Sequence, residues 1–291
     1  MRPVMAFVLL GVSASLAWAV PPLQSSEPHI VFQSRRDGFR DLYAIGVDGR
    51  DIRRLTRHRA HDGHPKYSAD GRKLVFNSER RGPWSIFTMN ADGSGVRILL
   101  RARQWDAYPC WSPDGKHIYF AGKRSRNVEI YRMDAGGGSL RNLTEHEADE
   151  THPAISPDGT KLAFSSNRDG PLWVFLKDLA TGSEVKLVEG SLPSWSPDGR
   201  RLAFTSSRDG DREIFTVGRD GTGLAQETRN RVADDWASWS PDGRFLAFAS
   251  ERDGNWEIYI RDLGSGTDRR LTNHPSMDIT PSWRPYADGS R

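Results

Sequence analysis

One tight-turn motif recurs along the chain at a nearly constant spacing. The motif Trp-Ser-Pro-Asp-Gly is complete at residues 111–115, 195–199 and 239–243, and variants of it stand at residues 155–159 and 67–71. The serines of the five copies are at positions 68, 112, 156, 196 and 240, so the spacings are 44, 44, 40 and 44 residues. A fixed period of this length indicates repeated supersecondary units that bury their core only by stacking on one another.

Each repeat predicts four short strands. Within the motif, Pro sets φ for the first corner of a turn, Asp can bond its own backbone, and Gly takes the left-handed position. An alternating run such as residues 202–206 follows, then an Arg-Asp-Gly turn such as residues 208–210. Residues 257–260 and 270–272 illustrate the third strand and a short fourth strand. A four-stranded repeat of this length is typical of a β-propeller blade.

The two ends of the chain predict the number of blades. The N-terminal copy begins at its second strand, residues 29–34, and the C-terminal end supplies only a first strand, residues 280–284. Trp283 follows Trp239 by 44 residues, so the register of the repeat is kept. We therefore expect an all-β fold, a six-bladed β-propeller of four-stranded antiparallel blades, closed by pairing of the C-terminal strand with the N-terminal blade. Closure of this kind removes free sheet edges.

The repeat resembles the WD40-like (PD40) propeller repeat of the TolB family. The resemblance rests on Trp-Ser-Pro-Asp-Gly, Phe-x-Ser and Arg-Asp-Gly, and it covers nearly all of the chain after residue 28. It implies a cell-envelope role and a partner there, such as a peptidoglycan-associated lipoprotein. TolB itself carries an α/β domain before its propeller, and we expect no counterpart of that domain within residues 1–28. Similar repeats occur in peptidase-associated propellers and in an oligogalacturonide lyase, so the motif specifies the fold more closely than the function.

The N-terminal residues predict export. Residues 1–19 read as a signal peptide, with Arg2 before an apolar run and Ala17-Trp18-Ala19 as the cleavage site. We expect a tether at 20–28, the propeller at 29–285 and a tail at 286–291. The mature protein would then be periplasmic or secreted and would hold no stable membrane span; an uncleaved N-terminal anchor is the alternative.

Composition narrows the class of partner. The net charge is +3, and removal of Arg2 with the signal leaves +2, so the sequence shows no basic excess or motif for nucleic-acid binding. The single cysteine excludes an internal disulfide bond. We expect a monomer.

Acidic residues recur three positions before the inner-strand proline position. They are Asp62, Asp106, Glu150, Asp234 and Asp278, and the sixth place is held by Gly190 in a connection that is four residues shorter. The connections between blades meet at one mouth of the channel, so these carboxylates should form a ring. One interpretation is that each carboxylate caps its own connection by bonding backbone N–H groups; the other is an acidic mouth that captures a basic or amide-rich peptide, or a metal. Their mutual repulsion calls for solvent, a backbone donor, Arg or Lys, or a cation.

Aromatic and histidine side chains recur at the same mouth. His64, Tyr108, His152 and Trp236 each directly precede the inner-strand proline position, and Lys66 should reach into the channel. His58, His146 and His274 stand seven residues before that position. Histidine with carboxylate can hold zinc or manganese, but these histidines come from different blades, so metal is the secondary interpretation and we expect no cofactor.

The pattern favours binding over catalysis. The chain has no Gly-x-Ser-x-Gly nucleophile motif, which argues against a serine hydrolase. We expect a non-catalytic propeller that binds a protein or peptide at the channel mouth. The alternative functions are a metal-assisted lyase or hydrolase acting on a sugar or lactone at the same mouth, and a structural module without a ligand.

Overall fold

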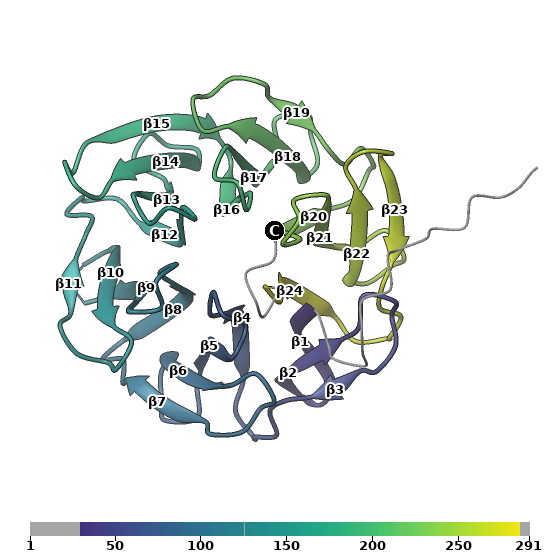
Figure 1. Cartoon of the computed structure of the whole chain (residues 1–291), viewed down its shortest axis with the longest axis horizontal. Coiled ribbons are helices and arrows are strands. Elements are labelled where there is room, and N and C mark those ends of the chain that lie inside the picture. Colours follow the sequence, from purple (N-terminus) through teal and green to yellow (C-terminus); the bar gives the residue numbers. More distant parts are fainter. Residues whose placement is uncertain (1–29, 125, 286–291) are drawn as a thin grey trace, which may run out of the picture.

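The computed structural model describes residues 30–124 and 126–285. These residues form six four-stranded antiparallel sheets around one central axis (Figure 1). The predicted signal peptide at 1–19, the tether at 20–28 and the tail at 286–291 lie outside the described residues. Within the described ranges, no helix has the length and apolar character needed to cross a membrane.

Each blade places one strand at the axis and three strands progressively further out (Figure 1). Blade 1 is the sheet that contains the first strand of the chain, and blades 2 to 6 follow in chain order. The innermost strands of blades 2 to 6, and then of blade 1, are β4 (Asp62–Tyr67), β8 (Trp105–Trp111), β12 (Glu150–Ile155), β16 (Ser191–Trp195), β20 (Asp234–Trp239) and β24 (Asp278–Trp283). In the same order the second strands are β5 (Lys73–Ser78), β9 (His117–Lys123), β13 (Lys161–Ser166), β17 (Arg201–Ser206), β21 (Phe245–Ser250) and β1 (Ile30–Asp37).

The two outer strands of each blade follow the same order of blades. The third strands are β6 (Ser85–Asn90), β10 (Val128–Asp134), β14 (Trp173–Asp178), β18 (Glu213–Gly218), β22 (Glu257–Asp262) and β2 (Phe39–Ile45). The outermost strands are β7 (Arg97–Leu100), β11 (Arg141–Asn142), β15 (Glu184–Glu189), β19 (Ala225–Gln226), β23 (Thr267–Arg270) and β3 (Arg53–Arg54). The predicted fold class is thereby confirmed.

Blade 1 is built from both ends of the chain. Strand β24 pairs antiparallel with β1, with Ile30 opposite Trp283 and Ser34 opposite Asp278. The side chain of Arg284 also reaches blade 2, where its Nε donates to the carbonyl of Gly71 at 3.1 Å. The predicted closure is therefore confirmed, and no blade leaves its inner strand unpaired.

The core repeats one aromatic position in every blade. The second strands supply Phe32, Phe76, Phe120, Phe164, Phe204 and Phe248, all of them fully buried. Each packs against an aromatic ring of the third strand with ring centroids 5.8–5.9 Å apart. Burial of one such ring contributes up to about 3 kcal/mol, so the repeated phenylalanine is a main reason why each blade folds as a unit.

The Ser-x-Asp-Gly turns are built alike. In each, the serine hydroxyl donates to the aspartate two residues later, for example from Ser196 to Asp198 at 2.6 Å. The same hydroxyl accepts the backbone N–H of the residue that opens the second strand, as from Arg201 to Ser196 at 2.9 Å. Neighbouring blades are linked by indole N–H groups: Trp195 Nε1 donates to the carbonyl of Ala154, and Trp239 Nε1 to that of Ser194.

Two kinds of segment share one face of the disc. Strands of a meander alternate in direction, so the Arg-Asp-Gly turns after the second strands lie at the same edge as the connections that enter the innermost strands. We call this the connection face; the Ser-x-Asp-Gly turns occupy the opposite face. The predicted acidic ring and the predicted aromatic residues both belong to the connection face, because they open the innermost strands.

Candidate functional site

The five ring carboxylates are gathered together, but they are buried. Asp62, Asp106, Glu150, Asp234 and Asp278 are each at most 1% exposed. An arginine of the turn after the second strand of the same blade reaches each of them, as Arg80 does to Asp62 at 2.5 Å and Arg36 to Asp278 at 2.7 Å. The equivalent pairs are Arg124–Asp106, Arg168–Glu150 and Arg252–Asp234. Arginine was one of the partners considered from the sequence, and it is paired with each of the five carboxylates.

This geometry differs from both interpretations of the acidic ring. Capping would have required backbone N–H donors, whereas the carboxylates pair with guanidinium groups. An acidic mouth would have required exposure to solvent, and burial removes it. Direct contact of these carboxylates with a partner stays a prediction; in the structure they anchor the turns that form the connection face.

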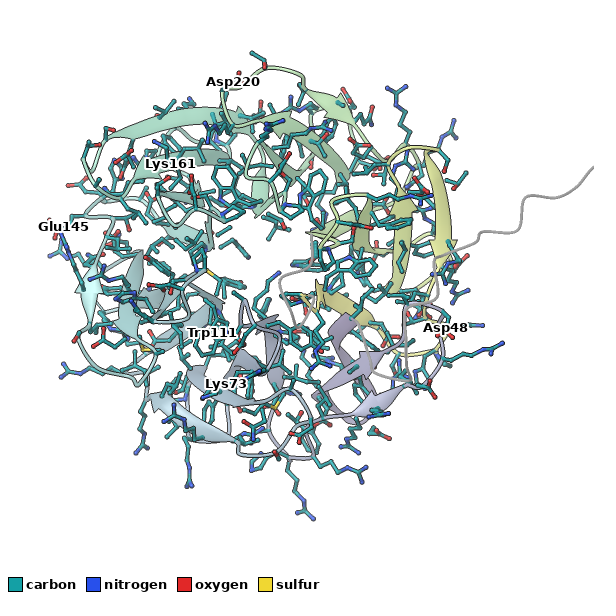
Figure 2. All side chains as sticks on the ribbon, viewed as in Figure 1. Asp48, Lys73, Trp111, Glu145, Lys161 and Asp220 are labelled. Carbon is teal, nitrogen blue, oxygen red and sulfur yellow. The ribbon has the colours of Figure 1, made fainter. Side chains whose placement is uncertain are left out.

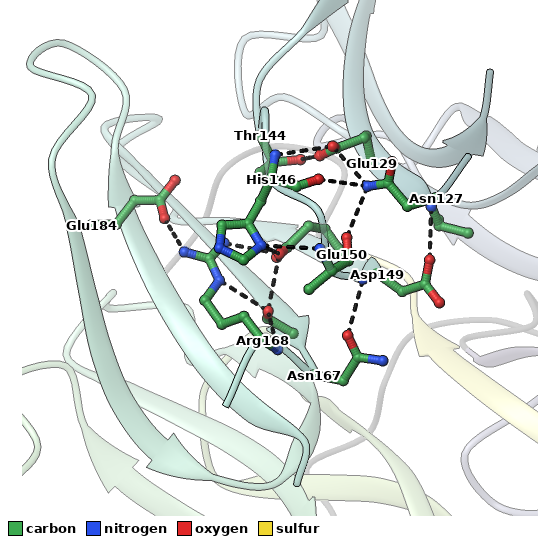
Figure 3. A network of polar contacts seen from close by, with 12 residues as sticks. Asn127, Glu129, Thr144, His146, Asp149, Glu150, Asn167, Arg168 and Glu184 are labelled. Carbon is green, nitrogen blue, oxygen red and sulfur yellow. Dashed lines mark hydrogen bonds and ion pairs between the residues drawn. The ribbon is translucent and has the colours of Figure 1, made fainter. Parts of the chain in front are cut away.

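The arginine of each blade is held from several sides. Its guanidinium lies over the rings of the second and third strands, as Arg168 does over Phe175 at 4.3 Å from the ring centroid. In five of the six blades its Nε donates to a serine of the second strand, as from Arg168 to Ser166 at 3.0 Å. Figure 3 shows Arg168 between Glu150 and Glu184, with distances of 2.9 and 2.6 Å.

Burial affects the acidity of the ring. It raises the pKa of Glu150 to about 7, although Arg168 and the Ser166 hydroxyl act in the opposite direction. Burial also raises the pKa of Asp62, Asp106 and Asp278 above the ordinary value, against the arginine beside each of them. The ring is therefore held at an electrostatic cost that the fold has to offset.

Blade 3 replaces the serine with Gly122. A Cβ atom at this position would lie 2.2 Å from Arg124 Nη1 and 2.5 Å from Asp106 Oδ1. The space is used by a two-point contact, because both Nη atoms of Arg124 donate to the two carboxylate oxygens of Asp106. A fork of this kind fixes the orientation of both groups.

Blade 5 lacks the carboxylate, because its connection is shortened. Arg208 Nη2 instead donates to the backbone carbonyl of Glu189 at 2.5 Å. Gly190 lies so close to the blade that an added Cβ would be 2.5 Å from the carbonyl of Thr205 and 2.6 Å from the ring of Phe204. Its φ of +145° also favours glycine.

Six residues with left-handed backbone conformation line the neck of the channel. They lie in the innermost strands where each pairing with the second strand is interrupted by a bulge, and their φ values run from 52° to 58°: His64, Tyr108, His152, Leu192, Trp236 and Thr280. Left-handed φ at non-glycine residues costs on the order of 1–3 kcal/mol each and occurs often at functional sites. The volume of the neck is about 70 Å³. Its lining includes the five residues that the sequence predicted for the channel mouth next to the proline position: His64, Lys66, Tyr108, His152 and Trp236.

Three of the ring-bearing residues of the neck contact one another in a row, from His64 through Tyr108 to His152. The rings of His64 and Tyr108 are 4.5 Å apart edge to face, and those of Tyr108 and His152 are 3.8 Å apart. Burial lowers the pKa of His64 and of His152 to about 3, so both imidazoles are neutral near pH 7. Burial also lowers the pKa of the Lys66 amine. The neck is thus aromatic and only weakly charged.

His58, His146 and His274 do not converge on a common point. In each, Nδ1 accepts the backbone N–H of the residue two positions later, at 3.0–3.1 Å. His146 also lies 3.9 Å from Glu150, as Figure 3 shows. Over residues 30–124 and 126–285, no group of three or more His, Cys, Asp or Glu side chains is arranged to hold a metal ion.

A hollow opens on the connection face where blades 4, 5 and 6 meet beside the shortened connection. Its volume is about 540 Å³, within the usual range for ligand pockets. The predicted residues Tyr108, His152 and Trp236 form its wall toward the axis. Its remaining wall and floor include Leu172, Glu189, Thr205, Arg212 and Asp235.

The floor of the hollow carries a buried carboxyl group that we did not predict. Asp235 is 1% exposed, and its Oδ2 lies 3.0 Å from Nη1 of Arg212, whose side chain is half exposed. Burial raises the pKa of Asp235 to about 6; Arg212 and the Thr205 hydroxyl act against this shift, and the nearby Asp234 and Glu251 add to it. An alignment of the repeats could have revealed this residue, because the equivalent positions hold Gly63, Ala107, Thr151, Ser191 and Ile279.

Known proteins share this architecture. The family described as TolB beta propeller domain matches residues 17–105, 99–188 and 171–291. TolB from Acinetobacter baumannii superposes with a TM-score of 0.80 at 19% identity, over 89% of this chain and 67% of that chain. A putative TolB from Agrobacterium tumefaciens superposes with a TM-score of 0.70 at 21% identity, over 89% of this chain and 92% of that chain.

An oligogalacturonate lyase in complex with manganese is more distant, with a TM-score of 0.55 at 19% identity over 87% of this chain and 75% of that one. No curated protein matches the chain. The structural likenesses show the fold alone, whereas the family match extends over all six blades. The chain belongs to the TolB β-propeller family.

Proposed function

We propose that this propeller is a non-catalytic binding protein of the cell envelope, and that it holds a segment of a protein partner in the hollow of the connection face. The hollow is the observation that carries the proposal. It is about 540 Å³ in volume, it joins the aromatic neck, and it mixes apolar with charged side chains. Concave sites of this composition are typical of ligand binding.

Further support comes from the position and exposure of single residues. Leu172 lines the hollow and is 45% exposed, and the indole of Trp236 packs edge to face against Trp256 at 5.2 Å. Rigid aromatic groups and exposed apolar groups are the usual anchors of protein interfaces. Family membership and the predicted signal peptide support the envelope location.

A pull-down from envelope extract tests the proposal. The bait is the full chain, and the test variant is Leu172→Glu, which places a charge in the wall of the hollow. The control is Leu224→Glu, because Leu224 is 47% exposed and precedes β19 on the opposite face. Both variants should melt like the parent, since neither leucine is buried.

The expected result is capture of the same partner by the parent and by the control, with loss of that partner in Leu172→Glu. Equal capture by both variants would place the binding surface elsewhere. Metal-dependent turnover of a sugar or lactone by the parent would instead favour the alternative of a lyase or hydrolase.

A further inference from the structure

Asp235 differs from its counterparts in chemistry as well as in burial. The other five blades carry Gly, Ala, Thr, Ser or Ile at this position, so the blade does not need a carboxylate there. Its neighbour Asp234 already fills the place of the ring carboxylate and pairs with Arg252. Asp235 is therefore a second, additional acid at the start of β20.

The polar groups at the floor of the hollow have unused hydrogen-bonding capacity. Among the described residues, neither carboxylate oxygen of Asp235 accepts a hydrogen bond of normal geometry; the carboxylate forms an ion pair with Arg212 and interacts more loosely with the hydroxyl of Thr205. The hydroxyl of Thr205, which is 3% exposed and also lines the hollow, makes no hydrogen bond of normal geometry either. Buried polar groups in this state are uncommon, because each forfeits its interaction with water without replacement.

The charge of the hollow favours a cationic ligand group. Asp235 and the exposed Glu189 contribute two negative charges, and Arg212 contributes one positive charge. The imidazoles of His64 and His152 at its inner wall are neutral near pH 7. The hollow therefore has a net negative charge in this pH range, although the whole chain is slightly basic.

The walls fit the stem of a long basic side chain. Leu172 and Trp236 offer apolar and aromatic surface on the way to the floor. Lysine and arginine bury their methylene stems along such surfaces while the charged head seeks a partner. Arg212 is half exposed, so its guanidinium can turn into solvent and give up its place beside Asp235.

We propose that the hollow receives a lysine or arginine side chain of the bound partner, with Asp235 as its buried counter-charge and Glu189 as a second carboxylate at the rim. This inference rests on the proposed function and names the chemistry that the partner must present. It also explains why a carboxylate occupies a position that the fold fills with small or apolar residues in the other blades.

The test uses small probes in place of the unidentified partner. The probes are Nα-acetyl-lysine N-methylamide, its arginine analogue and its norleucine analogue, which keeps the stem without the charge. The full chain is labelled with 5-fluorotryptophan, and the fluorine signal of Trp236 among the ten tryptophans is assigned with Trp236→Phe. The Trp236 signal should shift with the lysine and arginine probes, with affinities about tenfold or more above that of the norleucine probe.

Two variants bracket the role of Asp235. Asp235→Asn should lower the affinity for the lysine probe about tenfold and leave the affinity for the norleucine probe unchanged, because only the charge is removed. Arg212→Gln should raise the affinity for the lysine probe severalfold, because the guanidinium that competes for Asp235 is removed. Asp220→Asn is the control: it changes the net charge equally, and Asp220 lies at the outer rim in the turn before β19 (Figure 2).

Three results would overturn the inference: equal binding of norleucine and lysine probes, no effect of either variant, or no shift by the lysine probe up to its solubility limit. The pull-down distinguishes failure of this inference from failure of the proposed function. A partner that is lost in Leu172→Glu and kept in Asp235→Asn supports partner binding and rejects the basic side chain as its anchor.

Discussion

At the scale of single residues, Asp235 shows a conflict between binding and stability. A carboxyl group that is buried with one half-exposed partner is less stable ionised in the folded protein than in the unfolded chain, which is why burial raises its pKa from 3.8 to about 6. The folded protein thus binds this proton more tightly than the unfolded chain does. Its unfolding free energy should therefore fall as pH rises from about 4 to about 6.

Asp235→Asn should consequently stabilise the unliganded protein at pH 8. A rise in pKa from 3.8 to about 6 corresponds to roughly 3 kcal/mol, and this is the upper limit of the gain. The gain should be small at pH 4, because the folded carboxyl is protonated there and the unfolded one is partly protonated, and it should vanish at lower pH. Urea unfolding at pH 4 and pH 8 measures it, with Asp220→Asn as control. A variant that is less stable than the parent at pH 8 would show that Asp235 has a structural role.

A second residue-scale prediction concerns Gly190. Gly190→Ala should destabilise the protein by roughly 3 kcal/mol or more, because the new Cβ would overlap the Thr205 carbonyl and the Phe204 ring in addition to the strain at a φ of +145°. Gly170→Ala is the matched control: its φ is +91° and nothing lies within 4 Å of the added Cβ, so it reports the backbone strain alone. Similar unfolding free energies for the two variants would argue against the close approach that shapes the hollow.

At the scale of the structural element, one blade departs from the consensus sequence of the repeat and makes a different contact instead. In five blades a serine of the second strand accepts a bond from the arginine two residues later; these serines are Ser34, Ser78, Ser166, Ser206 and Ser250. Blade 3 has Gly122 there and compensates with the two-point contact between Arg124 and Asp106. The departure in sequence is therefore matched by a different contact within the blade.

Gly122→Ser should accordingly destabilise the protein by about 1–2 kcal/mol, although it restores the consensus, because its Cβ would displace the Arg124–Asp106 contact. Ala69→Pro also restores the consensus, at an exposed corner of the first turn, and should stabilise the protein by about 0.4–1 kcal/mol. Thermal unfolding of both variants and the parent measures the two changes in stability. Stabilisation by both substitutions would mean that the two-point contact adds nothing to stability.

At the scale of the whole molecule, stability depends on the closure of the ring. The pairing of β24 with β1 completes blade 1, and Ile279 of β24 packs in the core cluster shared with blade 6. A chain that ends at Met277 should expose the edge of β1, lose cooperative unfolding and associate. Urea unfolding followed by tryptophan fluorescence, with light scattering on the same samples, measures both effects. A monomeric chain with one sharp transition would show that five complete blades suffice.

The architecture could be predicted from the amino-acid sequence. The serine spacing, the turn residues and the repeated phenylalanines are local features, and each predicts strand, turn or core without knowledge of the other blades. The closure also followed from the sequence, because one incomplete repeat at each end supplied complementary strands. The gathering of His64, Tyr108, His152 and Trp236 at the channel was predicted for the same reason, since equivalent positions of a closed repeat must face the same axis.

The packing of the assembled ring was needed to tell which polar groups are buried in ion pairs and which line the hollow. The ring acids looked available in the sequence, but an arginine of the same blade pairs with each of them. In four blades it follows eighteen residues later, as in Arg80–Asp62, whereas Asp278 pairs with Arg36 from the other end of the chain. The acid that lines the hollow, Asp235, differs from its neighbour Asp234 by one position in a strand. Successive side chains of a strand point to opposite sides, so burial and charge at each depend on which blade packs there. That contact is a property of the assembled ring, and no single repeat specifies it.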